Sequence, residues 1–221
     1  KKVFGGLDGT GNKPRRVSAY YVHRLESFSR KNKKKKRGRP SKKRKVRRYI
    51  KLFPFIELRL QLPIAAGFSR RSGSESPFFI PVGKKAMRCG KPFSKVSLDM
   101  GYDAEYVHEF IRENMKAVSI IPARNMDVPV WRTQGRYRKK MKRGYSKKDY
   151  HQRSKNETVN GVLDALMGDH VNALDWRMQN KELMFRLIMY AAYRFVKIKE
   201  KIFAILILLF RALVSRPFYI S

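Results

Sequence analysis

The sequence predicts an α/β domain in which short apolar strands alternate with helices. Apolar runs of strand length occur at Lys2–Leu7 and Lys95–Leu98, and each is followed by an aspartate. Apolar residues recur with helical spacing in Ala104–Met115 and again in Asn180–Lys199. With 221 residues, 43% of them hydrophobic, the chain can bury one sizeable core.

The charge balance indicates a polyanionic partner. The chain has 52 Lys plus Arg against 17 Asp plus Glu, a net charge of +35. This excess is far beyond what solubility requires, and nucleic acid is the expected partner. A ribosomal or chromatin protein would have the same balance, so charge indicates the partner and not the activity.

Cysteine and histidine usage argues against disulfides and zinc. Cys89 is the one cysteine, so neither a disulfide nor a thiolate zinc cluster can form within the chain. The four histidines are scattered without the spacing of metal ligands. No signal peptide opens the sequence, and we expect a reducing, cytoplasmic location.

The first apolar run ends in Asp8-Gly9-Thr10-Gly11, which predicts a tight turn. Asp8 is then either a turn residue bonded to its own backbone or a carboxylate presented at a strand end, where α/β sheets place their chemistry. A second β-prone piece begins at Tyr20–Val22.

The segment Arg30–Arg48 contains fourteen Lys or Arg among nineteen residues, and we expect a solvated basic loop or arm. Its Arg37-Gly38-Arg39-Pro40 resembles an AT-hook core, whose arginines would enter a narrow minor groove. Plain phosphate binding is the alternative. The candidate DNA contacts in this arm are Arg37, Arg39, Lys42, Lys43 and Arg44.

The middle of the chain supplies further strands and a second strand-end acid. Tyr49–Phe68 predicts two strands, although its prolines argue against full pairing in a central position. Phe78–Val82 leads towards a helix or turn, and Val118–Pro122 predicts a buried strand. Asp103 is placed to cap the helix that follows it, whereas Asp99 is not needed for that purpose.

Basic and aromatic residues are interleaved between Arg124 and Lys148. Trp131, Tyr137 and Tyr145 lie among the cations of this connection. This composition suits nucleic acid, through phosphate contacts and base stacking. A surface loop with aromatic anchors is the alternative interpretation.

The stretch Tyr150–Asp164 places polar residues along one helical stripe. Tyr150, Arg153, Glu157 and Asp164 fall within an arc of roughly 60° at ~100° per residue. They form either one wall of a polar site or a solvated face with an Arg153–Glu157 ion pair.

The C-terminal part predicts a long apolar helix. Leu183, Leu187, Ala191 and Phe195 recur every four residues, as on a core-facing stripe. The run from Ile202 to Phe210 is very apolar, but it is too short for a membrane span. We expect a buried or oligomer-forming helix.

Together these passages resemble the DDE transposases of bacterial and archaeal insertion sequences. The resemblance covers roughly residues 1 to 196. It rests on LDGTG with AYYVHRL behind it, SLDMGYDAEYVHEF, IIPARN, and YHQRSKNETV. The last passage fits a Tyr-x2-Arg-x3-Glu signature through Tyr150, Arg153 and Glu157.

The resemblance implies a ribonuclease-H-like mixed sheet flanked by helices, with a basic insertion and a helical C-terminal part. Asp8, Asp99 and Glu157 would be the catalytic triad and would bind two Mg²⁺ ions, or Mn²⁺, about 3.5–4 Å apart. Tyr150 and Arg153 would contact DNA near the scissile phosphate. Strand cleavage would free the element's ends, and transesterification would join them to target DNA.

The same resemblance implies a homodimer acting on DNA in a prokaryotic, nucleoid-associated setting. Four departures accompany it. The family's lysine seven positions beyond the signature glutamate is replaced by Asp164, an N-terminal DNA-binding region is expected but absent, residues 53 to 80 match poorly, and the tail after Val196 matches nothing expected of the family. These suggest a truncated or decayed copy, so a non-catalytic nucleic-acid-binding protein and a ribonuclease-H-like nuclease remain as alternatives.

Overall fold

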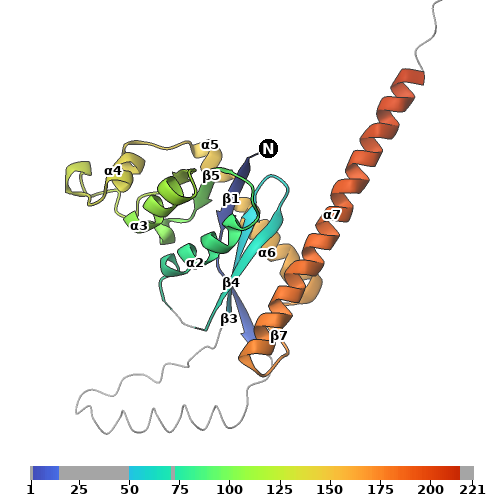
Figure 1. The fold of residues 1–221 in the computed structure, drawn as a ribbon, viewed down its shortest axis with the longest axis horizontal. Coiled ribbons are helices and arrows are strands. Elements are labelled where there is room, and N and C mark those ends of the chain that lie inside the picture. The colour runs from blue at the N-terminus through green and yellow to red at the C-terminus, as the bar shows by residue number, and fades with distance from the viewer. Residues whose placement is uncertain (1, 15–49, 71–72, 215–221) are drawn as a thin grey trace, which may run out of the picture.

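The computed structural model of the protein describes residues 2–14, 50–70 and 73–214, with the side chains of the last helix described as far as Leu208. The basic arm at 30–48, with its five candidate DNA contacts, and the Tyr20–Val22 piece lie outside the described residues. The architecture is one mixed sheet with helices on both of its faces (Figure 1).

The sheet has seven strands in the order β6-β5-β1-β3-β2-β7, with β4 paired to β3. Strand β3 is antiparallel to β1, β2 and β4, whereas β5 and β6 continue from β1 in parallel. The strands are β1 (Val3–Leu7), β2 (Thr10–Pro14), β3 (Ile50–Glu57), β4 (Leu62–Ser69), β5 (Phe93–Leu98), β6 (Val118–Ile120) and β7 (His170–Val171).

Helices connect and cover the strands. One group precedes the signature stretch: α2 (Ser76–Met87), the 3-10 turn η1 (Met100–Tyr102), α3 (Glu105–Glu109) with its π-helical continuation η2 (Phe110–Asn114), the 3-10 turn η3 (Val130–Arg132) and α4 (Arg136–Arg143). The second group is α5 (Lys147–His151), α6 (Ser154–Met167) and α7 (Trp176–Val214). The α/β class that the sequence predicts is confirmed.

The sheet separates two hydrophobic cores, and β3 contributes to both because its side chains alternate between its faces. Phe53 and Phe55 pack in a core with α2, α3 and η2, where the aromatic ring of Phe79 contributes to the packing. Leu52 and Ile56 pack on the opposite face against residues of α6 and α7. The strand is therefore apolar on both sides, as its sequence indicates.

The segment after β1 does not form the predicted tight turn. Strand β1 pairs with Phe55–Glu57 of β3, and β2 pairs with Ile50–Leu52 of the same strand. The chain therefore runs on in the same direction and in the same register, with the ladder interrupted at Asp8 and Gly9. Pro54 lies opposite this interruption, which explains how a central strand accommodates a proline.

Two local predictions are wrong. Asp103 does not cap a helix, since Ala104 holds the N-cap position of α3. The Asp103 carboxylate instead accepts a hydrogen bond from the backbone N–H of Arg124 at 2.9 Å and two from the guanidinium of Arg138 at 2.9 and 2.8 Å. The signature stretch is also not one helix, because α5 ends at His151 and α6 begins at Ser154.

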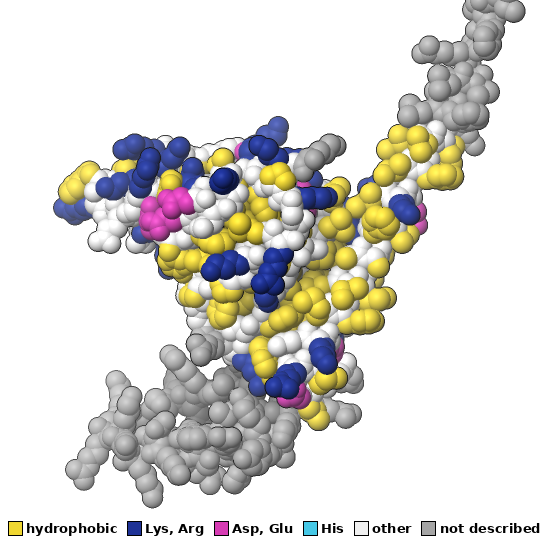
Figure 2. Space-filling model, in the orientation of Figure 1, with side chains coloured by type: hydrophobic (Ala, Val, Ile, Leu, Met, Phe, Trp, Pro, Cys, Tyr) yellow, Lys and Arg dark blue, Asp and Glu magenta, His cyan; other side chains and the backbone are white. Residues whose placement is uncertain are grey.

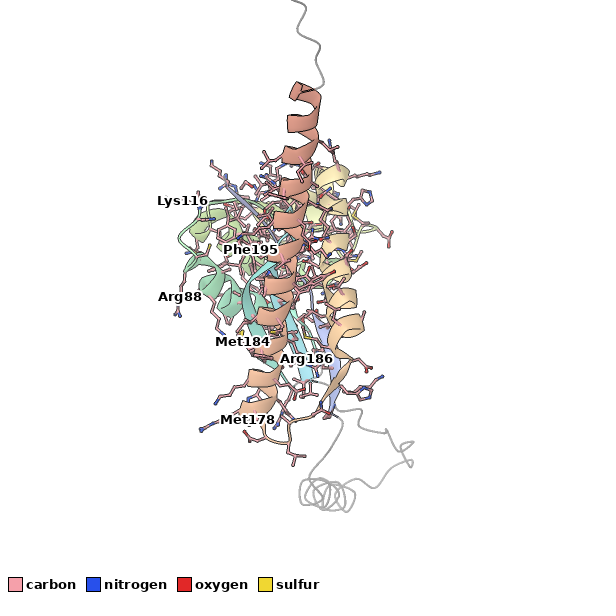
Figure 3. All side chains as sticks on the ribbon, turned by 90° about the vertical axis from the view of Figure 1, so that its right-hand side faces the viewer. Arg88, Lys116, Met178, Met184, Arg186 and Phe195 are labelled. Carbon is pink, nitrogen blue, oxygen red and sulfur yellow. The ribbon has the colours of Figure 1, made fainter. Side chains whose placement is uncertain are left out.

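The C-terminal helix is core-facing only in its first part. Leu183 and Leu187 of α7 are buried against the sheet, whereas Phe195 is exposed and the apolar residues at 202 to 208 are 42–67% exposed. Figure 1 shows α7 continuing past the domain, and Figure 3 looks onto its outer side, where Met184 and Phe195 lie along the helix. Within the described residues no helix is both long and apolar enough to cross a membrane.

The aromatic cluster on the α2 side generates a stability prediction. Phe79 has no exposed surface and lies within 6.1–6.4 Å, centroid to centroid, of the rings of Phe55, Tyr102 and Phe110. We expect Phe79→Ala to lower the free energy of unfolding by about 3–5 kcal/mol, since truncation leaves a cavity. Urea denaturation measures this. Phe203→Ala, at a site that is 67% exposed, is the control and is expected to change little.

Candidate active site

Two aspartates leave the sheet side by side. Strands β1 and β5 are parallel neighbours, and Leu7 is paired with Leu98 in their register. Asp8 and Asp99 are the residues that follow this pair, so their Cα atoms emerge at the same edge of the sheet. Carboxyl ends of adjacent parallel strands are where α/β sheets present functional groups.

Local backbone geometry fixes both aspartates. The Asp8 carboxylate accepts a hydrogen bond from the backbone N–H of Gly9 at 3.0 Å. Asp99 begins the turn η1, where its carbonyl accepts from the backbone N–H of Tyr102 at 2.9 Å. Both aspartates are half-buried residues.

The signature tyrosine and arginine lie beside this pair. The Tyr150 hydroxyl donates to Asp99 Oδ1 at 3.5 Å, and the Arg153 guanidinium lies 5.8 Å from the centroid of the Tyr150 ring. Burial lowers the pKa of Arg153, but the carboxylate of Asp99, then Tyr150, Glu157 and Asp8, together outweigh burial and raise it. Arg153 is therefore the cation on which the three predicted acids act together.

Glu157 faces Arg153 rather than the two aspartates. Its carboxylate lies 2.9 Å from the guanidinium, one turn along the chain, and its side chain is 57% exposed. Among the described residues, no three His, Cys, Asp or Glu side chains are grouped closely enough to hold a metal ion. The roles of Asp8, Asp99 and Glu157 as a metal-binding triad stay a prediction.

The charge of Asp8 is poorly compensated. Burial raises the pKa of Asp8 to about 6; Arg153 acts against this shift, and the carboxylates of Glu75 and Asp99 add to it. The surroundings of Asp8 thus disfavour its ionised carboxylate, and a cation bound beside it would stabilise the negative charge.

The two aspartates fit a hard divalent ion. Carboxylate oxygens are the donors that Mg²⁺ prefers, and Mg²⁺ binds through one or two carboxylates plus water and phosphate oxygens. Asp8 and Asp99 would hold such an ion. Glu157 would join them only after leaving Arg153.

Sequence reasoning missed Glu75 and Tyr102. The Glu75 carboxylate accepts from the Tyr102 hydroxyl at 3.2 Å and pairs with Lys51 at 3.0 Å. Burial raises the pKa of Tyr102 far above its ordinary value, and the charges of Glu75, Asp8 and Asp99 raise it further. The segment 53 to 80, which contains Glu75, matches the family poorly and carries no motif that would have indicated Glu75. Tyr102 lies in the family-like passage Gly101-Tyr102-Asp103 after Asp99, and that passage is the signal from which it could have been found.

The predicted basic connection forms a charged surface beside the site. Figure 2 shows Lys and Arg side chains gathered around α4. Arg138 anchors this helix by its bidentate contact with buried Asp103. Trp131 is 71% exposed, with the Arg132 guanidinium 4.7 Å from the centroid of its ring.

Asp164 lies away from the signature residues. It is seven positions beyond Glu157, about 10 Å along the helix axis. Burial raises its pKa, as does the charge of Asp169, and Arg186 acts in the opposite direction. Its charged neighbours are thus at the far end of α6.

A comparison with solved structures relates this fold to that of a known protein. The chain is similar to the piggyBac transposase in the cryo-EM structure of its synaptic complex with hairpin DNA, with a TM-score of 0.50 and 8% sequence identity. The match covers 87% of this chain and 46% of that one, so the chain spans less than half the length of this structural relative. At this identity the likeness concerns the fold, which is the ribonuclease-H-like fold of a transposase.

The family follows from the sequence match. Residues 10–192 match the family described as the transposase DDE domain, which is most of the chain. The protein belongs to this transposase family. A comparison with curated proteins gave no match.

The raised pKa of Asp8 predicts a pH-dependent stability. Because this carboxyl ionises less readily in the folded chain than in the unfolded one, its ionisation opposes folding above about pH 6 and has no effect below its ordinary pKa of 3.8. We expect Asp8→Asn to raise the free energy of unfolding near neutral pH by up to about 3 kcal/mol. The gain should shrink as pH falls through 6 towards 4.

Urea denaturation at several pH values tests this expectation. Asp127→Asn, in an exposed loop, is the control that removes the same charge. A stability gain for Asp8→Asn that is constant with pH would contradict the assignment.

Proposed function

We propose that the protein catalyses Mg²⁺-dependent DNA strand cleavage and strand transfer at insertion-sequence ends. The observation that carries this proposal is the emergence of Asp8 and Asp99 from register-paired positions of adjacent parallel strands. The proposed catalytic domain spans residues 1–196, and by sequence residues 197–221 are proposed as an apolar tail outside it.

Divalent ions, when bound, would supply Lewis-acid charge to the attacking and leaving oxygens of an in-line displacement at phosphorus. Asp8 and Asp99 would be the first ligands, and Glu157 the third. In cleavage, a bond forms between a water oxygen and phosphorus while the bond from phosphorus to the 3′-oxygen breaks. In transfer, the oxygen of the freed 3′-hydroxyl forms a bond to a phosphorus of the target strand while the bond from that phosphorus to the target's own 3′-oxygen breaks, which leaves a 3′-hydroxyl on the target.

Tyr150 and Arg153 would orient the scissile phosphate. Arg153 is suited to this role because its planar guanidinium can donate two hydrogen bonds to phosphate oxygens. A phosphate contact would also draw Arg153 away from Glu157 and release that carboxylate towards Asp8 and Asp99.

The duplex would lie along the basic surface around α4. Its cations would contact phosphates, and exposed Trp131 offers a ring on which a base can stack. The proposed partners are transposon ends and target DNA. A homodimer would bring two ends together in a prokaryotic cytoplasm, in association with the nucleoid.

A binding-only protein is the competing proposal, favoured by Asp164 in place of the family's lysine. Asp99→Asn separates the two. We expect it to abolish Mg²⁺-dependent cleavage of a plasmid carrying the element's ends while DNA affinity stays within about 2-fold, because the carboxylate binds metal and not phosphate.

Glu109→Gln, on the exposed side of α3, is the matched control and should cleave normally. Equal cleavage by the wild type and by Asp99→Asn would remove Asp99 from the catalytic site, and no cleavage by either would support a binding-only protein.

The surface around α4 generates a salt-dependence prediction. Lys140, Arg143, Lys147 and Lys148 are exposed, and changing all four to Gln should reduce the magnitude of the slope of log K against log salt by up to about 3.6, at about 0.9 per phosphate contact. Fluorescence anisotropy with labelled duplex measures this slope.

The control removes four exposed cations elsewhere. These are Lys84, Arg88, Lys91 and Lys116, of which Figure 3 labels the second and fourth. An equal loss of slope in both variants would show that net charge, and not this surface, determines binding.

A further inference from the structure

Glu75 contacts both of the segments that carry the site's aspartates. It lies at the N-cap position of α2, yet its side chain makes no capping hydrogen bond. Its carboxylate turns instead towards Lys51, Tyr102 and the backbone of Gly9. A residue that could stabilise its own helix is thus committed to three contacts outside it.

The first contact ties Glu75 to the Asp99 turn. The Tyr102 hydroxyl donates to Glu75 Oε2 at 3.2 Å, and the backbone N–H of the same tyrosine donates to the carbonyl of Asp99 at 2.9 Å. Tyr102 is 1% exposed and packs edge-on against Phe79, so its ring has little freedom to move. Fixing the hydroxyl therefore fixes the turn η1.

The second contact ties Glu75 to the Asp8 segment. A Cβ added to Gly9 would lie 2.8 Å from both carboxylate oxygens of Glu75 and 2.9 Å from the ring of Phe53. The Glu75 carboxylate therefore lies in close contact with the backbone beside Asp8, where any residue larger than glycine would force the carboxylate or the Phe53 ring to shift. Gly9 also donates the backbone hydrogen bond that orients Asp8.

The third contact, an ion pair with Lys51, stabilises the negative charge of Glu75 close to the two aspartates. Lys51 lies 3.0 Å from Glu75 Oε1, and both side chains are about three-quarters covered. Lys51 comes from β3, where it is paired with Gly11 of β2. The lysine thus offsets the repulsion between Glu75 and the two aspartates and anchors the glutamate to the sheet.

We propose that Glu75 is a positioning residue that holds the Asp8 and Asp99 segments at a fixed separation. Its role in metal binding rests on the proposed function of those two aspartates. Residues that orient metal ligands through hydrogen bonds commonly contribute 10–100-fold to metal affinity.

The experiment measures Mn²⁺ binding to the full chain by electron paramagnetic resonance. We expect Glu75→Ala to weaken Mn²⁺ binding about 10-fold. Glu75→Gln retains an acceptor for the Tyr102 hydroxyl and should bind within about 3-fold of wild type. Adding Tyr102→Phe to Glu75→Ala should cause no further loss, because both changes break the same contact.

A second measurement needs no metal. Hydrogen exchange of the backbone amides of Gly9 and Tyr102 should be about 10-fold faster in Glu75→Ala than in wild type, because the two segments lose their common support. Glu182→Ala is the control: this carboxylate also accepts backbone hydrogen bonds, from Asn172 and Ala173, but at the start of α7. It should lower stability without changing Mn²⁺ affinity.

The outcomes are distinct. Unchanged exchange at Gly9 and Tyr102 in Glu75→Ala would overturn the positioning role, as would equal Mn²⁺ losses in Glu75→Gln and Glu75→Ala, which would indicate a charge effect. A wild-type chain that binds no Mn²⁺ would overturn the proposed function alone, and the exchange data would still decide the role of Glu75.

Discussion

The parallel pairing of β1 with β5 is the constraint on which the site depends. Two aspartates separated by some ninety residues become neighbours because Leu7 and Leu98 share a register position. A slip of one residue would turn one of the two side chains to the opposite face of the sheet. The buried residues of both strands, such as Val96, oppose that slip, so the hydrophobic core and the candidate chemistry are specified by the same contacts.

The interruption at Asp8 and Gly9 is the second requirement. Strand β3 binds β1 and β2 one after the other along a single edge, so the chain between them could have continued as a strand. At this interruption the backbone N–H of Gly9 donates to the Asp8 carboxylate, and the Glu75 carboxylate lies close to Gly9.

The parts of this fold that follow from local patterns were predictable, and those that depend on distant partners were not. Apolar runs ending on Asp8 and Asp99 indicated both strand ends. The sequence of β2, Thr-Gly-Asn-Lys-Pro, has little strand propensity, and it is extended because β3 and β7 pair with it. Asp103 has the position of a helix cap, but the guanidinium of Arg138, 35 residues away, binds its carboxylate. Glu75 stands in a polar loop with no motif around it.

Charge balance explains why Glu157 lies apart from the aspartates. Two carboxylates at adjacent strand ends repel each other, and Arg153 is the cation that acts on both. Arg153 also attracts Glu157, which lies one turn further along α6. Their 2.9 Å ion pair holds the Glu157 carboxylate in a largely exposed position. The ion pair with Arg153 thus accounts for the position of the Glu157 side chain. Under the proposed function, a phosphate that binds the arginine would therefore free the glutamate at the same time.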